Sequence, residues 1–274
     1  GASFSIGGSV AFGLGSQTML LMPAYVSLSV GGAAVAYTSF MLGFMYPKRQ
    51  AMVLTFASCL FDASIGVFAV GALFYTYLDV QRSTVFFGYA VLGLVLFATH
   101  ICLWHNARDE LARRVEEARL ADLETDMSYK AAEAEGVYGL PFATQTRSLE
   151  FFLSTVWLCV HLFRSNSFIA LAHPLFVRNG DDGSASTIFG FILPLGFLAA
   201  PVVGRLLEHF GVVVNLQLVN GLGVLVSLVS LVPSVNVQLL NAGLYTFYRA
   251  ALYSTMAAFN AATFGPATMG RVCG

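Results

Sequence analysis

The sequence predicts an all-α membrane protein: a polytopic transmembrane bundle with about eight spans in two halves. Hydrophobic residues make up 57% of the 274 residues and charged residues only 11%, whereas a soluble domain carries about 25% charged residues. The apolar runs match the length of membrane helices, about 20 residues, and lack the two-residue alternation of barrel strands. We therefore expect an integral membrane protein in contact with lipids, in the plasma membrane or an organelle membrane.

Eight apolar segments are candidate spans. In chain order they cover 3–20, which is short, and then 23–46, 51–76, 83–104, 149–176, 185–208, 212–232 and 237–264. The connections between them are short and rich in turn-forming residues, as in 179–183 and Pro233-Ser234. Pro194 and Pro201 are expected to kink the sixth segment, because a proline inside a helix removes one backbone donor.

One long polar segment, 105–148, separates the first four spans from the last four. It carries roughly half of the charged side chains, and its apolar residues recur at helical spacing. We interpret 106–135 as an amphipathic helix that Gly136 and Pro141 end. A solvated linker and a regulatory or docking element are both open readings. The predicted division is an N-terminal transmembrane half at 1–104, an intracellular linker at 105–148 and a C-terminal transmembrane half at 149–274.

The charge pattern sets the expected topology and excludes one class of partner. Lys and Arg residues concentrate in the connector and in the loops on its side of the membrane, which favours the inside for the connector. The formal net charge is −1 and no basic cluster is present, so we expect no nucleic-acid partner.

Three formal charges lie near the middle of apolar segments: Asp62, Arg164 and Arg249. A charged side chain at this depth costs about 2.5–3.5 kcal/mol on insertion scales. Such residues normally face the interior of a bundle or a wet cavity, where they find partners. These three residues are therefore the strongest functional candidates in the chain.

A glycine-rich motif joins the sixth and seventh segments. It reads Gly204-Arg205-Leu206-Leu207-Glu208-His209-Phe210-Gly211 and resembles the loop signature of the major facilitator superfamily, Gly-x-Leu-x-Asp followed by Gly. In that family the motif forms a tight turn beside the gate. Here Glu208 replaces the aspartate, and two valines replace the basic pair that usually follows.

Three further segments are similar to one branch of that superfamily, the sodium-independent large-neutral-amino-acid facilitators. Tyr46–Arg49 with Ser58–Ser64 looks like the junction of helices four and five, Leu162–Ile169 like helix seven, and Tyr248–Tyr253 with Phe264–Pro266 like helix ten. The resemblance implies that the eight spans are helices three to ten, that 105–148 is the central intracellular loop, and that helices one, two, eleven and twelve are absent.

The resemblance also implies a site, because helices five, seven and ten face the central cavity in this fold. An Arg presents a forked donor array to a carboxylate, and Asp62 is suited to an ammonium group. The expected substrate-binding residues are Arg249, Arg164, Asp62, Asn166, Tyr248 and Tyr253, and the expected gating residues are Gly204, Arg205, Glu208 and Gly211. The alternative is a structural role, either in an ion pair or triad between the two halves or as an arginine that caps free carbonyls of a broken helix.

Two functions follow from these observations. The first is facilitative uptake or exchange of a neutral amino acid, or a similar small zwitterion, by alternating access. The second is a transport-inactive accessory subunit, bound to membrane subunits that supply the missing helices. No catalytic triad, HExxH motif or acidic metal cluster occurs in the sequence, so we expect no enzyme, cofactor or metal. His161 is either a hydrogen-bonded residue of the bundle or a proton relay.

Overall fold

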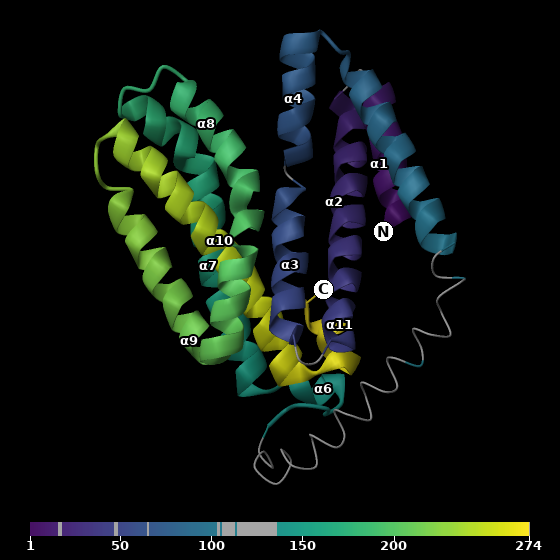
Figure 1. The fold of residues 1–274 in the computed structure, drawn as a ribbon, viewed down its shortest axis with the longest axis vertical. Helices are drawn as coiled ribbons and strands as arrows, with labels where there is room; N and C mark the ends of the chain where they lie inside the picture. Colours follow the sequence, from purple (N-terminus) through teal and green to yellow (C-terminus); the bar gives the residue numbers. More distant parts are fainter. Residues whose placement is uncertain are drawn as a thin grey trace. The chain divides into compact units, whose positions relative to one another are not determined.

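A computed structural model gives the fold (Figure 1), and it describes residues 1–15, 18–46, 49–64, 66–102, 105, 113 and 136–273. These residues form helices and connecting turns, and no strand lies among them. The predicted all-α class is confirmed. Most of the predicted linker helix at 106–135 lies outside the described residues.

The chain folds into two compact units, and each is described by itself below. The first unit contains residues 1–45 and 67–129, and the second contains 46–66 and 130–274. Residues 46–66 thus fold with the C-terminal part of the chain. The predicted division at the polar connector stays a prediction.

The first unit begins with two helices that pack closely, α1 (Ala2–Leu14) and α2 (Thr18–Phe40), followed by the short helix η1 (Met41–Met45). A Cβ on Gly8 would lie 2.9 Å from the Ala24 carbonyl oxygen and 2.9 Å from Leu28. Glycine at this position therefore lets the two backbones approach each other, as is common in membrane bundles.

Two further helices complete the described part of the first unit: α4 (Gly66–Leu78) and the helix Arg82–Cys102. The Phe86 ring lies 4.6 Å from that of Phe12 on α1. Arg82 donates a hydrogen bond to the Gly15 carbonyl and stands over the Phe12 ring. These contacts hold the beginning of the helix Arg82–Cys102 against the end of α1.

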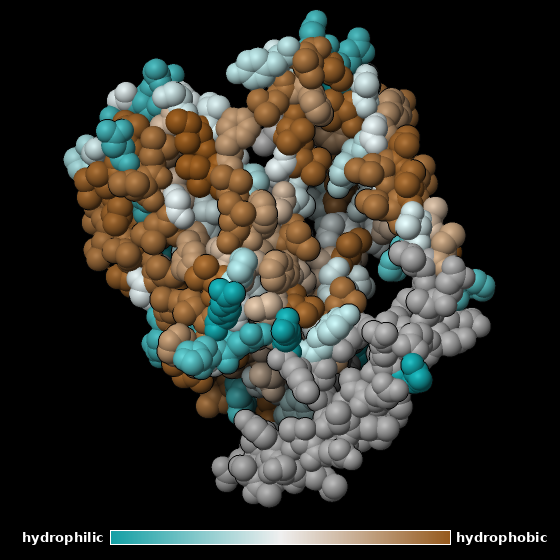
Figure 2. All heavy atoms as spheres, in the orientation of Figure 1, coloured by the Kyte–Doolittle hydropathy of each residue, from teal (hydrophilic) through white to brown (hydrophobic). Residues whose placement is uncertain are grey.

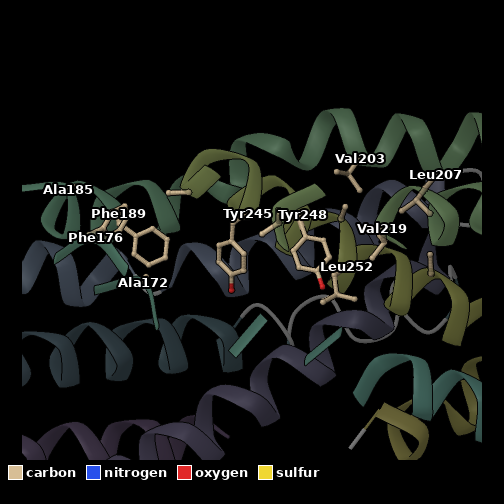
Figure 3. Packing of buried hydrophobic residues seen from close by; sticks show 14 residues of the cluster. Ala172, Phe176, Ala185, Phe189, Val203, Leu207, Val219, Tyr245, Tyr248 and Leu252 are labelled. Carbon is tan, nitrogen blue, oxygen red and sulfur yellow. The ribbon is translucent and has the colours of Figure 1, made fainter. Parts of the chain in front are cut away.

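The second unit is built around α10 (Val235–Phe264). The other elements are α3 (Gln50–Ala63), α6 (Phe142–Gln145), α7 (Leu149–Arg178), α8 (Ser184–Ile192), η3 (Leu193–Ala199), α9 (Ala200–Val229) and α11 (Pro266–Cys273). Helix α10 packs against α3, α7, α8, α9 and η3. Its buried Tyr245, Tyr248 and Leu252 join Val219 and Phe189 in the main hydrophobic core (Figure 3).

Four helices of the described chain are long and apolar enough to cross a membrane: Met19–Phe44, Arg82–Cys102, Leu149–Arg178 and the continuous run Ser184–Val229. Hydrophobic residues cover most of the visible surface of the described helices in Figure 2, and hydrophilic residues gather towards their ends. Both observations agree with an integral membrane protein. Eight spans remain a prediction, since α1 has only 13 residues and α10 is rich in polar residues.

The structure divides one predicted span and extends another. The segment 51–76 forms two helices, because α3 ends at Ala63 and α4 begins at Gly66. The predicted loop 204–211 is helical as far as Phe210, and only Gly211 departs from helical geometry, with φ 75° and ψ 176°. Gly211 therefore forms the kink between the two helical parts of α9. Helix continues to the turn because it satisfies the backbone polar groups internally.

Candidate functional site

The described part of the second unit contains a cluster of polar side chains between its helices, together with one glycine that they contact. We call this group the polar cluster. It consists of Trp157, His161, Arg164 and Ser165 on α7, Asn220 and Gly223 on α9, and Tyr245 and Tyr248 on α10. The α7 members recur every three or four residues, so they share one face of that helix.

His161 is the centre of the cluster, and both of its ring nitrogens have partners. Nδ1 lies 2.8 Å from the Tyr248 hydroxyl, and Nε2 lies 2.9 Å from Oδ1 of Asn220. The same Asn220 oxygen accepts a hydrogen bond of 2.8 Å from the Trp157 indole nitrogen. His161 is therefore a hydrogen-bonded residue of the bundle, as one of the two sequence interpretations predicted.

The proton positions follow from the chemistry of these groups. An indole N–H can only donate, so the amide atom that faces Trp157 must be the Asn220 oxygen. An oxygen in that place can only accept, which means that His161 carries its proton on Nε2. When the ring is neutral, Nδ1 accepts the Tyr248 hydroxyl proton, and the donors of the chain all point in one direction.

Tyr245 lies beside Tyr248 on α10 and binds α7 in the same manner. Its hydroxyl donates 3.0 Å to the Ser165 carbonyl oxygen and accepts 2.7 Å from the Ser165 hydroxyl. The ring stacks on Phe168, with 4.2 Å between centroids. Figure 3 shows both tyrosine hydroxyls on the same side of α10. Two adjacent turns of α10 are thus fixed to α7.

Arg164 lies at the middle of α7 and is half-buried. Its guanidinium interacts with the Tyr248 hydroxyl and approaches the backbone of α9 at Gly223. Among the residues whose side chains the structure describes, no carboxylate forms an ion pair with Arg164. The described groups that contact the cation are therefore neutral, and they lie at the middle of a helix long enough to span a membrane.

Arg249 is buried on α10 but lies outside the polar cluster. It follows Tyr248 directly, and consecutive helical side chains leave the axis about 100° apart. Its guanidinium carbon stands 5.6 Å from the centroid of the Tyr253 ring, one turn along the same face. The structure thus brings Arg249 together with Tyr253, and Arg164 together with Tyr248.

Asp62 belongs to α3, and its side chain lies outside the described residues. The helix register nevertheless places its backbone. On one side of Asp62, Cys59 packs with Ala250 of α10. On the other side, Gly66 lies against Pro194 of η3, and Gly196 of the same short helix contacts Thr246 of α10. The backbone of α3 at Asp62 therefore lies level with residues 246–250 of α10, the stretch that carries Arg249.

The other predicted residues have different surroundings. Asn166 is exposed on α7 and takes no part in the polar cluster. Gly204 is buried where α9 meets Met52 of α3, whereas Arg205, Glu208 and Gly211 are exposed. Their assignment to a gate remains a prediction. In the described part of the chain, no three His, Cys, Asp or Glu side chains group as metal ligands would.

The sequence predictions did not include four members of the polar cluster: Trp157, Asn220, Gly223 and Tyr245. Asn220 carried the only usable signal, because an amide inside an apolar span requires partners. Gly223 gave none, since glycines in membrane helices most often allow ordinary close packing.

No family model, no curated protein and no solved structure matches this chain. The function is therefore argued from the site itself.

Proposed function

We propose that this chain is a membrane transport protein that carries a neutral amino acid, or a similar small zwitterion, by facilitative uptake or exchange. Alternating access in an architecture like that of the major facilitator superfamily is part of this proposal. The observation that carries it is the setting of Arg164. This half-buried cation lies at the middle of a membrane-length helix, and the described groups that it contacts are neutral.

A substrate carboxylate would supply the missing negative charge. Placing a guanidinium at this depth costs about 2.5–3.5 kcal/mol on insertion scales, and a charge-assisted hydrogen bond with a carboxylate offsets much of that cost. Transporter substrates bind near the bilayer midplane, and Arg164 lies midway along α7, a helix long enough to span the membrane.

The second charged region of the proposal is formed by α3 and α10. The backbone at Asp62 is level with the stretch of α10 that carries Arg249, so an acid and a base lie at one depth. In our proposal Asp62 serves the substrate ammonium group, and Arg249 balances that acid when no substrate is bound. Tyr253 and Asn166 are proposed as neutral contacts.

The test is uptake of L-leucine by purified full-length protein in proteoliposomes. Arg164→Ala should lower uptake at least tenfold, because it removes the cation and its donors. Arg164→Lys should restore it in part, since lysine keeps the charge but lacks the fork. The matched control is Arg178→Ala, which alters an exposed arginine in the last turn of the same helix.

Unchanged uptake by a folded Arg164→Ala protein would contradict this site. Absence of uptake by the unaltered protein, combined with isolation in a fixed ratio with other membrane proteins, would instead favour the accessory-subunit function.

A further inference from the structure

Gly223 of α9 lies directly against the guanidinium of Arg164. A Cβ built on Gly223 would overlap Nη1 of Arg164, and it would lie 3.2 Å from Cζ of Arg164 and 3.2 Å from Cε2 of Tyr248. Gly221, two positions earlier along the same helix, has nothing within 4 Å of such an atom. The space at Gly223 is therefore occupied by the cation, whereas the helix does not require glycine at Gly221.

Tyr248 contacts the guanidinium through its hydroxyl oxygen. The hydroxyl has a single proton, and the orientation of His161 assigns that proton to Nδ1 of the imidazole. The oxygen therefore meets Arg164 as an acceptor. Trp157 stands at the far end of this chain, where its indole N–H fixes the Asn220 amide.

One neutral acceptor uses only part of the hydrogen-bonding capacity of a guanidinium, which carries several N–H donors in a planar fork. The guanidinium interacts with the Tyr248 hydroxyl, and the bare backbone at Gly223 leaves room for it. No further acceptor for these donors is found among the side chains that the structure describes, so we assign the remaining donors to a ligand. Carboxylates match this fork with two parallel hydrogen bonds.

We propose that Gly223 is a positioning residue that seats Arg164 as a carboxylate receptor, with the chain Trp157–Asn220–His161–Tyr248 setting the orientation of the guanidinium. The inference rests on the proposed transport function, and it adds that the carboxylate of the substrate is the group recognised in the second unit. A neutral His161 fits this role, because an imidazolium would donate to Tyr248 and place a second cation beside Arg164.

Substitution at Gly223 should act on ligand preference rather than on folding. The atoms in the way of a new methyl group include the far end of a flexible side chain, so Arg164 can move aside. Gly223→Ala should then leave thermal unfolding nearly unchanged, while the guanidinium loses its place beside Tyr248. Gly221→Ala is the matched control, because its methyl group meets no atom.

The experiment measures direct binding of two probes, L-leucine and L-leucine methyl ester, to the purified full-length protein in nanodiscs. The ester keeps the ammonium group but has no carboxylate. We expect Gly223→Ala to weaken leucine binding at least tenfold and to leave ester binding unchanged, whereas Gly221→Ala should change neither. Tyr248→Phe, which removes the hydroxyl that accepts from Arg164 and contacts His161, should reproduce the loss for leucine.

A double substitution separates positioning from a structural role. Lysine at position 164 lacks the planar group that Gly223 accommodates, so Gly223→Ala should cost little more leucine binding in an Arg164→Lys background. Equal losses in both backgrounds, or equal losses for leucine and its ester, would overturn the proposal. So would leucine affinity that Gly223→Ala leaves unchanged.

The binding measurement also distinguishes this inference from the transport function on which it rests. Carboxylate-selective binding that depends on Gly223, without uptake in proteoliposomes, would support the receptor and contradict transport. Uptake that Gly223→Ala leaves intact would support transport and overturn the receptor.

Discussion

At the scale of single residues, Asp181 shows how one carboxylate organises the start of a helix. Oδ1 accepts hydrogen bonds from the Ala185 backbone at 2.9 Å and from the Ser184 hydroxyl, and Oδ2 accepts from the backbone and hydroxyl of Ser186. The hydrogen bond from Ala185 N–H is the main reason why the pKa of Asp181 is lowered from its ordinary value. The ionised carboxylate therefore favours the folded loop and the first turn of α8.

Asp181→Asn should lower the thermal stability of the protein at neutral pH. Because the pKa of Asp181 is lower in the folded protein, its contribution is fully present above the pKa of the unfolded chain and is lost as the pH falls through the folded value. The stability difference between the two proteins should therefore shrink in acid.

The measurement is the unfolding temperature of the purified protein at neutral and at acidic pH. Asp182→Asn is the control, since the Asp182 carboxylate accepts fewer hydrogen bonds in the structure, with Ser184 N–H as its donor at 3.1 Å. Equal destabilisation by the two substitutions, at every pH, would contradict this account of Asp181.

The sequence was informative about residues that are costly to place inside a membrane, because that free-energy cost alone marks them as functional candidates. Arg164 and Arg249 are conspicuous because charge is rare inside an apolar run, and the structure places Arg164 among partners. The partners of Gly223 and Asn220 could not be predicted, because those partners are distant in the chain. His161 and Tyr248, for example, are 87 positions apart in the sequence, and no local sequence pattern predicts a contact between residues so far apart.

At the scale of elements, α9 shows that a single non-helical residue is enough to join two helical segments. Gly211 alone adopts a positive φ of 75°, and Asn215 donates 2.7 Å to its carbonyl oxygen. The loop motif at 204–211 therefore predicted the turn but not its size, because helix continues until Phe210.

Gly211→Ala should destabilise the protein, because a positive φ with an extended ψ is essentially restricted to glycine and costs a residue with a Cβ about 1–3 kcal/mol. Gly221→Ala, a substitution in the helical part of α9, should be neutral or stabilise by as much as ~1 kcal/mol, since alanine favours helix over glycine. Reversible unfolding of both variants in detergent, followed by circular dichroism, measures the difference. A Gly211→Ala variant as stable as the unaltered protein would show that φ is not positive there.

The segment 51–76 illustrates the opposite limit of prediction from sequence. Hydropathy treats it as one continuous apolar run, but the chain ends α3 at Ala63 and begins α4 at Gly66. A Cβ on Gly66 would lie 3.2 Å from Pro194 of η3. The start of α4 thus lies against a residue far along the chain, and composition does not reveal that neighbour.

At the scale of the whole molecule, the main finding is that residues 46–66 fold with the C-terminal part of the chain. Helix α3 contributes Cys59 to a small core with Ala200 and Ala250, and the Cys59 thiol lies 3.9 Å from the Ser254 hydroxyl. The C-terminal unit is therefore completed by a segment from the first half of the sequence.

A disulfide between α3 and α10 tests this arrangement. Ser254→Cys should form a bond with Cys59 under mild oxidation in membranes, because a small rotation of either side chain brings the sulfur atoms together. Mass spectrometry of the linked peptides would detect it. Thr255→Cys is the control, since the next residue of a helix points about 100° away. Equal linkage from both positions, or none, would contradict the packing of α3.

The central place of α10 has a consequence for how this sequence can change over time. Because the helix packs against α3, α7, α8, α9 and η3, a substitution in it must suit several neighbours at once, whereas a lipid-facing position needs only to stay apolar. We expect α10 to diverge more slowly than the outward faces of α7 and α9. A distant relative of this chain would then be recognised first by the stretch around Tyr245, Tyr248 and Arg249.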